Sequence, residues 1–303
     1  MRRLVSVRGI DARLHLQSCL SAGMRTLCAL CLLFTCVLTA TVGAKERYPF
    51  AVTSARSGTG QTLIARNRGP APVSVRLMLA NAENVSSGQP LPVYAVVRPY
   101  SEMLLLQVRR SDPRRSQRFA TESTYQLGSF LAVPDARAVY RLPYENGRGF
   151  VISQAADGPL TTHHGEDSRY AVDFRMPENT PIVAARAGVV IATESAHRLG
   201  GKDRALLSLA NHVRILHVDD TIATYAHLAF AGVRVRLGER VTSGTLIGYS
   251  GATGYTSGPH LHFVVQKLAR REAGFAPISV PLRFSAGRPP QVFEPRYQQL
   301  AVP

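Results

Sequence analysis

Cysteine is confined to the first 44 residues of this chain, and nothing after them offers a disulfide. The four cysteines are Cys19, Cys28, Cys31 and Cys36. Met24-Arg25-Thr26 precedes an apolar run over residues 27–40, and Val42-Gly43-Ala44 follows it, which is the pattern of a secretory signal. We expect a signal peptide over residues 1–44, with Met24 as an alternative start and cleavage after Ala44. The mature chain would then be exported, either periplasmic or secreted. It would contain no cysteine, so the four cysteines are excluded as metal ligands.

Long apolar runs and acidic residues are also scarce. No later stretch reaches the roughly 18 apolar residues of a membrane span, so we expect no transmembrane segment in the mature chain. Residues 1–44 hold five of the 36 basic and one of the 20 acidic residues, which leaves 31 against 19 and a net charge of +12. A positive surface favours anionic partners such as acidic glycopeptide polymers. No aromatic residues alternate with the basic clusters, which argues against nucleic acid.

The mature N-terminal part, residues 45–150, has the pattern of short strands separated by turns. Apolar and polar residues alternate over residues 73–79, and further apolar segments cover 62–66, 93–97 and 103–108. This spacing predicts a β-sandwich of immunoglobulin-like type. It holds no catalytic constellation, so its expected roles are spacing, wall or partner binding, or partial occlusion of an active site. Residues 141–149 are the predicted linker.

The following part, residues 155–270, is also rich in short strands and has no long helical period. The expected strands cover residues 182–185, 188–192, 213–217, 222–225 and 260–265. Residues 271–303 form a C-terminal strand, expected at 278–284, and a loose proline-rich tail. The fold class predicted for the whole chain is therefore all-β.

A metal site is indicated by His260-Leu261-His262, with Asp173 and His163 upstream. Side chains alternate across a strand, so His260 and His262 would lie on one face. Imidazole nitrogen and carboxylate oxygen are ordinary zinc ligands, and a catalytic zinc site uses three protein ligands and leaves a fourth position open. A further histidine, His227, lies at what is predicted to be a strand end.

Seven ordered segments resemble the lysostaphin/LytM-type zinc metalloendopeptidases, which cut peptidoglycan peptides. They lie between residues 158 and 267 and include DFRMPENTPI at 173–182, AGVV at 187–190, NHVRILH at 211–217, YAHL at 225–228, GERV at 238–241, LIG at 246–248 and HLH at 260–262. The resemblance implies an antiparallel β-sheet with a groove whose floor bears one zinc ion. It also implies that His163, Asp173 and His262 are the metal ligands, and that His227 and His260 are the catalytic pair without contact to the metal.

Two ligand positions have alternatives. The family usually places its first histidine four residues before the aspartate, whereas His163 and Asp173 are ten apart. Asp167 satisfies the shorter spacing, but only after Asp173 does the family's register continue, as far as Pro181. His164 is an alternative to its neighbour His163.

Other positions carry smaller predictions. Asn179 stands where the family usually has glycine, and asparagine is expected to keep the left-handed turn. His212 and His217 are predicted to be structural, and His197 to be solvated in the loop over residues 196–203.

The leading functional hypothesis is a zinc-dependent endopeptidase that hydrolyses peptide bonds in peptidoglycan cross-links. The alternative is a non-catalytic module on the same fold that binds peptidoglycan or activates a hydrolase. A structural zinc protein is a weaker reading, since structural sites usually close all four positions with cysteine or histidine. The exact bond, and which of His227 and His260 acts as the general base, stay open at this point.

Overall fold

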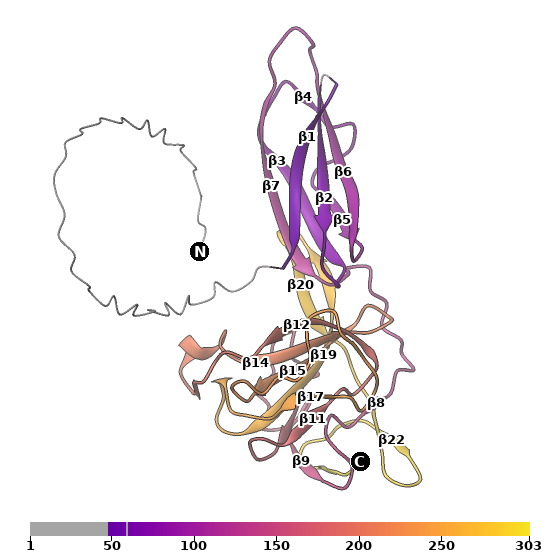
Figure 1. Cartoon of the computed structure of the whole chain (residues 1–303), viewed down its shortest axis with the longest axis vertical. Coiled ribbons are helices and arrows are strands. Elements are labelled where there is room, and N and C mark those ends of the chain that lie inside the picture. Colours follow the sequence, from indigo (N-terminus) through magenta and orange to yellow (C-terminus); the bar gives the residue numbers. More distant parts are fainter. Residues whose placement is uncertain (1–47, 59) are drawn as a thin grey trace, which may run out of the picture. The chain divides into compact units, whose positions relative to one another are not determined.

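The computed structural model describes residues 48–58 and 60–303 (Figure 1). The predicted signal peptide and its four cysteines therefore lie outside the described residues. Strands dominate the rest, and one short 3-10 turn, η1 (Arg204–Leu206), is the helical element of this part. Within the described ranges, no helix has the length and apolar character needed to cross a membrane.

The N-terminal strands form two antiparallel sheets that enclose one apolar core. The first sheet has the order β1-β2-β6-β4 and the second the order β5-β3-β7. Their bounds are β1 (Phe50–Ser57), β2 (Gly60–Asn67), β3 (Val73–Glu83), β4 (Val85–Ser86), β5 (Val93–Val97), β6 (Ser101–Arg110) and β7 (Arg118–Leu127). Val75 and Leu77 of β3 pack with Leu63 of β2 and Leu106 of β6 between the sheets. The immunoglobulin-like assignment of these strands stays a prediction.

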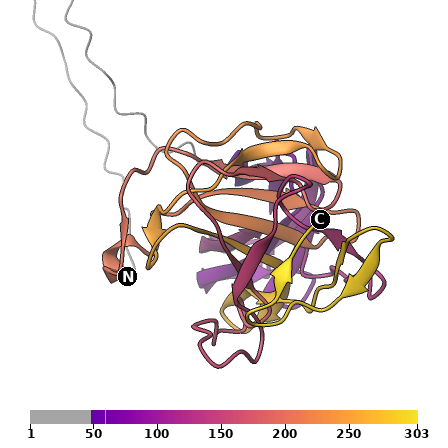
Figure 2. The ribbon, with the colours of Figure 1, turned by 90° about the horizontal axis from the view of Figure 1, so that it is seen from below.

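A nine-stranded sheet forms the centre of the following region (Figures 1 and 2). Its order is β16-β12-β14-β15-β19-β10-β9-β23, with β20 paired to β19, and every pair is antiparallel. The bounds are β9 (Phe150–Gln154), β10 (Val172–Arg175), β12 (Gly188–Glu194), β14 (Asn211–Leu216), β15 (Ile222–Leu228), β16 (Arg240–Val241), β19 (His260–Arg271), β20 (Gly274–Ser279) and β23 (Leu300–Ala301). The predicted antiparallel sheet is therefore confirmed.

Strand alternation divides this sheet into an apolar face and a polar face. On β19, Leu261, Phe263 and Val265 are fully buried in the core, while His260 and His262 have the opposite parity. The same holds on β14, where Val213 and Ile215 face the core. Small sheets close the edges of this core, and they contain β8 (Tyr140–Arg141), β11 (Pro181–Val183), β13 (Gly200–Gly201), β17 (Leu246–Tyr249), β18 (Gly254–Tyr255), β21 (Phe284–Ala286) and β22 (Gln291–Phe293).

The predicted linker at residues 141–149 is not a free connection. Leu142 and Tyr144 are fully buried in the same core as the nine-stranded sheet, and the Tyr144 hydroxyl donates a hydrogen bond to the Ala301 carbonyl at 2.8 Å. The sequence pattern did not predict this burial, because glycine and charged residues surround the two apolar side chains in the chain. The second structural region therefore begins before residue 150.

The C-terminal tail is also more ordered than the sequence indicated. Phe284 is fully buried in the core, and β21 pairs with β8 and β22. The strand expected at 278–284 is divided between β20 and β21. Pro281 lies between them, and proline cannot donate a backbone hydrogen bond to a ladder.

The N-terminal part contacts the large sheet near the start of β15 and at the hairpin of β19 and β20, where Tyr94 of β5 packs edge-on against Phe275. Ala71 packs with Ile191 and Ile222 in a small buried cluster. Ile222 is the first residue of β15, whereas His227 lies near its last residue. These contacts lie at the end of the strand away from His227, so they give no support to the predicted occlusion of the active site.

Candidate metal centre and active site

The strand register brings Asp173 and His262 side by side. Asp173 of β10 lies directly opposite His262 of β19, and His262 lies opposite Ala226 of β15. Residues opposite one another in an antiparallel pair point to the same face. Two residues further along β10, Arg175 lies opposite His260, and this two-residue step confirms that both histidines of the HLH segment lie on one face of the sheet.

His163, Asp173 and His262 form a group that could hold a metal ion. Each offers one ligand atom, and the three atoms lie within 4.8 Å of one another. His163 Nε2 is 3.4 Å from Asp173 Oδ2, and His262 Nδ1 is 2.9 Å from Asp173 Oδ1. Tetrahedral zinc with bonds of about 2.1 Å needs ligand atoms roughly 3.4 Å apart. The two distances to the Asp173 carboxylate, 3.4 and 2.9 Å, lie at or below that value, and all three ligand atoms lie within 4.8 Å of one another.

His163 reaches this group from the loop between β9 and β10. The Gln154 side chain of β9 accepts hydrogen bonds from the Thr162 backbone N–H at 2.6 Å and from its hydroxyl at 3.0 Å. This holds the chain next to His163, whose ring then packs edge-on against His262 at 4.9 Å between centroids. His164 and Asp167, the alternative ligands, are both exposed and lie outside the group.

Asp173 is buried beneath three histidine rings and is only 2% exposed. Burial alone would raise the pKa of its carboxyl group, but hydrogen bonds with His163 and His262 outweigh burial and hold that pKa far below its ordinary value. His260 Nε2 lies 3.7 Å from Asp173 Oδ2 as well. The carboxylate is therefore a fixed negative charge in a nitrogen-rich setting, which suits a divalent cation.

His227 is held in an unusual backbone conformation. Its φ angle is +61°, a left-handed value that costs a residue with a β-carbon about 1–2 kcal/mol. Its Nδ1 lies 2.7 Å from the Thr253 carbonyl oxygen, so Nδ1 carries the proton and Nε2 is left with its lone pair. Burial, with a smaller contribution from His260 and His262, lowers the pKa of His227 to about 4.

His260 has the same arrangement of its ring nitrogens. Nδ1 donates to the Gly258 carbonyl oxygen at 2.9 Å and lies 3.2 Å from the Thr256 hydroxyl oxygen. The His227 and His260 rings are 4.6 Å apart between centroids. Both rings thus have Nδ1 committed to backbone carbonyls, which leaves both Nε2 atoms available for proton transfer.

Asn211 lies in the NHVRILH segment and is a supporting residue whose role the sequence pattern did not predict. Its buried side chain donates to the carbonyls of His197, Leu228 and Ala229 at 2.8, 3.3 and 3.2 Å, and accepts from the His197 N–H at 3.0 Å. These bonds fix the chain that follows His227. Asparagine before a histidine on a strand gave no signal of this role, because its partners are distant backbone carbonyls.

The remaining predictions on individual residues can be compared with their surroundings. Asn179 has a φ angle of +62°, so its left-handed turn is confirmed. His197 is not simply solvated, because its side chain is 27% exposed and its Nε2 lies 3.7 Å from Glu194. His217 is buried with Nδ1 2.8 Å from the Ala187 carbonyl oxygen, and burial lowers its pKa to about 4. His212 lies on the same face as His262, with Ala226 between them.

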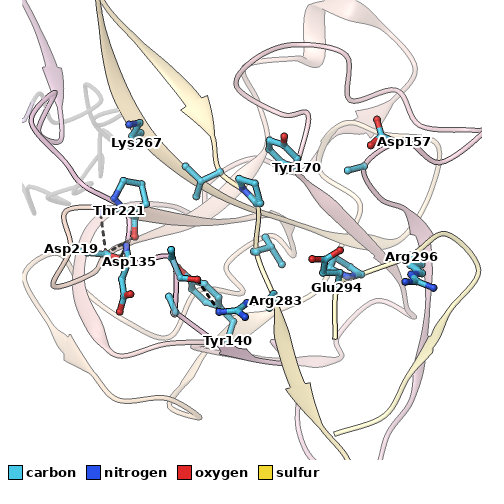
Figure 3. A pocket seen from close by; sticks show the side chains of 18 residues that line it. Asp135, Tyr140, Asp157, Tyr170, Asp219, Thr221, Lys267, Arg283, Glu294 and Arg296 are labelled. Carbon is cyan, nitrogen blue, oxygen red and sulfur yellow. Dashed lines mark hydrogen bonds between the residues drawn. The ribbon is translucent and has the colours of Figure 1, made fainter. Parts of the chain in front are cut away.

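Two hollows differ in their relation to these histidines. One, of about 430 Å³, adjoins the candidate centre and is lined by Ser153, Gln154, Leu160, Asp173, Arg175, Ser257, Gly258, Pro259 and His260. A larger one, of about 840 Å³, lies among Tyr140, Lys267, Arg283 and Glu294 and includes none of the five predicted site residues (Figure 3). At its edge Asp219 accepts from Arg186 at 2.9 Å and from Thr221 at 2.7 Å. The smaller hollow is therefore the one next to the candidate chemistry.

A comparison with known protein families matches the part of the chain that holds four of the five predicted site residues. Residues 167–273 match the model of Peptidase family M23. The match begins after His163, so the place of that histidine rests on its geometry.

Among curated relatives, the chain is 29% identical over 120 residues to the glycyl-glycine endopeptidase ALE-1 of Staphylococcus capitis, covering 40% of this chain and 28% of that protein. It is 37% identical over 91 residues to the peptidoglycan DD-endopeptidase ShyA of Vibrio cholerae, covering 30% of this chain and 18% of that protein. The chain thus spans between about a fifth and a third of the length of these two relatives. A solved catalytic domain, that of the prophage-encoded M23 protein EnpA from Enterococcus faecalis, aligns with 26% identity and a TM-score of 0.32 over 41% of this chain and 85% of that one.

Proposed function

Because residues 167–273 belong to the lysostaphin/LytM-type peptidases of family M23, we propose that this chain is a zinc metalloendopeptidase that hydrolyses peptide bonds in peptidoglycan cross-links. The observation that carries the proposal is the convergence of five side chains at one end of the sheet. Three of them, His163, Asp173 and His262, offer ligand atoms within 4.8 Å of one another. The other two, His227 and His260, lie next to this group. We propose peptidoglycan outside the cytoplasm as the substrate.

The donor set fits zinc. Two imidazoles and one carboxylate are a ligand set found in catalytic zinc sites, which keep a fourth position for water or substrate. The Nδ1 atom of His163 is buried without a hydrogen-bond partner in the described part of the chain, so its ring has Asp173 as its polar contact. When bound, zinc would supply a Lewis acid for the scissile carbonyl and for the attacking water.

The two remaining histidines suit the proton transfers of amide hydrolysis. Since His227 and His260 each hold a proton on Nδ1, their Nε2 atoms can accept a proton from water and return it to the leaving amine. A protonated Nε2 can also donate a hydrogen bond to the oxygen on which negative charge develops. The close spacing of the two rings, 4.6 Å between centroids, allows the two roles to be divided between them.

The test uses purified mature protein and purified sacculi. Zymography and chromatography of released muropeptides would be run with zinc, after chelation, and after zinc is restored. We expect release of new amino termini that disappears with chelator and returns with zinc. Binding to sacculi without any release under zinc-replete conditions would instead favour the non-catalytic wall-binding or hydrolase-activating module.

A further inference from the structure

Arg175 occupies a position beside the candidate centre that the proposed mechanism does not use. It follows Asp173 by two residues on β10, so both side chains lie on the same face of the sheet. It also lies directly opposite His260 of β19. Opposed residues in antiparallel strands have their α-carbons about 4.5–5.5 Å apart. The Arg175 side chain therefore starts two residues from the candidate ligand Asp173 and directly opposite the candidate catalytic residue His260.

The Arg175 side chain is exposed and has no hydrogen-bond or ion-pair partner among the described residues. Across residues 48–58 and 60–303, the Arg175 side chain takes part in no hydrogen bond, ion pair or ring contact. It lines the 430 Å³ hollow that adjoins the centre, together with Asp173 and His260. The one carboxylate in the lining belongs to Asp173, which already engages His163 and His262. Arg175 is thus a cation in the wall of this hollow without an internal counter-charge.

Neighbouring groups in the hollow add polar surface but no competing anion. Ser257, Gly258 and Pro259 form the turn that leads into β19, and Ser153 and Gln154 come from β9. The oxygen of the Gln154 side chain is already bonded to Thr162. A ligand in this hollow would therefore meet an arginine with five free donors, and the one anion in the lining is Asp173, which already engages His163 and His262.

We propose that Arg175 binds a free carboxylate on the residue next to the scissile bond, so that the enzyme selects anionic peptides over neutral ones. The inference rests on the proposed function and deepens it by naming the chemical class of the substrate. A guanidinium group pairs with a carboxylate through two parallel hydrogen bonds, which gives specificity for this group as well as affinity. An extended peptide advances about 3.3 Å per residue, so a carboxylate held at Arg175 leaves an adjacent peptide bond beside His260.

The test compares two forms of one substrate. Cross-linked muropeptide dimers are used with free carboxylates, and after amidation with ammonium and carbodiimide. Initial rates are measured on zinc-loaded mature protein for wild type, Arg175→Gln and Arg175→Lys. Arg240→Gln is the matched control, since Arg240 is also an exposed strand arginine, but on β16, which β12, β14, β15 and β19 separate from β10.

Wild type should have a kcat/KM about 10- to 100-fold higher for free than for amidated dimers, as expected for a charge-assisted hydrogen-bonded pair. Arg175→Gln should lose that factor on free dimers, mainly through KM, and should match wild type on amidated dimers. Arg175→Lys should fall between the two, and Arg240→Gln should behave as wild type. Zinc content should be equal in all four proteins.

Any result other than the expected one also decides for or against the arginine site. An equal loss on both substrates in Arg175→Gln would place the arginine at the reacting carbonyl and overturn the proposal. A similar loss in Arg240→Gln would reduce the effect to net charge and also overturn it. If wild type cleaves neither form, equilibrium binding of the dimers to the zinc-loaded proteins separates the two ideas. A preference for free dimers that Arg175→Gln abolishes supports the arginine site although the proposed hydrolysis fails, and no preference overturns the arginine site as well.

Discussion

Replacing His227 by glycine should remove the chemistry while leaving the fold nearly unchanged. The left-handed backbone of His227, with φ at +61°, costs about 1 kcal/mol or more, and glycine relieves that cost. Against this, the change removes the hydrogen bond to the Thr253 carbonyl, worth about 0.5–1.5 kcal/mol, and adds about 0.5–1 kcal/mol of chain entropy. The net loss of stability should be about 1 kcal/mol or less. Turnover should fall by about 10²–10⁴-fold, as for removal of a positioned proton-transfer group.

Alanine at the same position is the informative control. It removes the same ring and hydrogen bond and keeps the left-handed strain, but it does not add the chain entropy of glycine, so His227→Ala should be less stable than His227→Gly by up to about 1 kcal/mol. For a chain of this size that corresponds to roughly 2–4 °C in Tm. Urea unfolding, zinc analysis after dialysis and muropeptide release would be measured on both variants. An alanine variant more stable than the glycine variant would refute the argument from backbone strain, and loss of zinc in both would show that His227 is a ligand.

Three further predictions concern the ligands, a buried histidine and a supporting amide. Asp173→Asn should lose bound zinc and activity together, whereas Asp167→Asn should retain both, and metal analysis with the reverse pattern would show that Asp167 is the ligand. His217 has a pKa of about 4 when folded against 6.5 when unfolded, so the unfolded chain binds the proton first and stability should fall as pH drops from 6.5 to 4. The loss is on the order of 3 kcal/mol, and His217→Gln should flatten the slope of unfolding free energy against pH in that window. Asn211→Ala leaves three carbonyls and one N–H without their side-chain partner and should cost about 2–4 kcal/mol in urea unfolding, and a variant as stable as wild type would contradict that role.

Strand periodicity carried most of what the sequence could predict. Alternation placed His260 and His262 on one face, and the register beside Asp173 confirms that they share it. The left-handed turn at Asn179 followed from the chemistry of asparagine alone. These predictions depend on residues close together in the chain, where the local backbone decides which way a side chain points.

Contacts between distant residues were harder to predict. Leu142 and Tyr144 read as part of a linker because their neighbours are charged or glycine, yet both complete the core under the large sheet. Removing residues 45–150 would therefore remove core side chains along with the N-terminal strands. The role of Asn211 was equally hidden, because its partners are carbonyls 14 to 18 residues away. No local sequence pattern predicts a long-range hydrogen bond of this kind.

The arrangement of β10 explains why a specificity residue would lie at position 175. If Asp173 must face a metal ion, the two-residue period of the strand forces residue 175 to face the same side. Its side chain must then meet whatever peptide lies across His260, its partner on β19. The geometry of the metal ligand thus fixes where residue 175 lies but not which residue it is. The type of residue at position 175 can therefore vary with the substrate. An arginine at this position would favour a substrate that carries a negative charge.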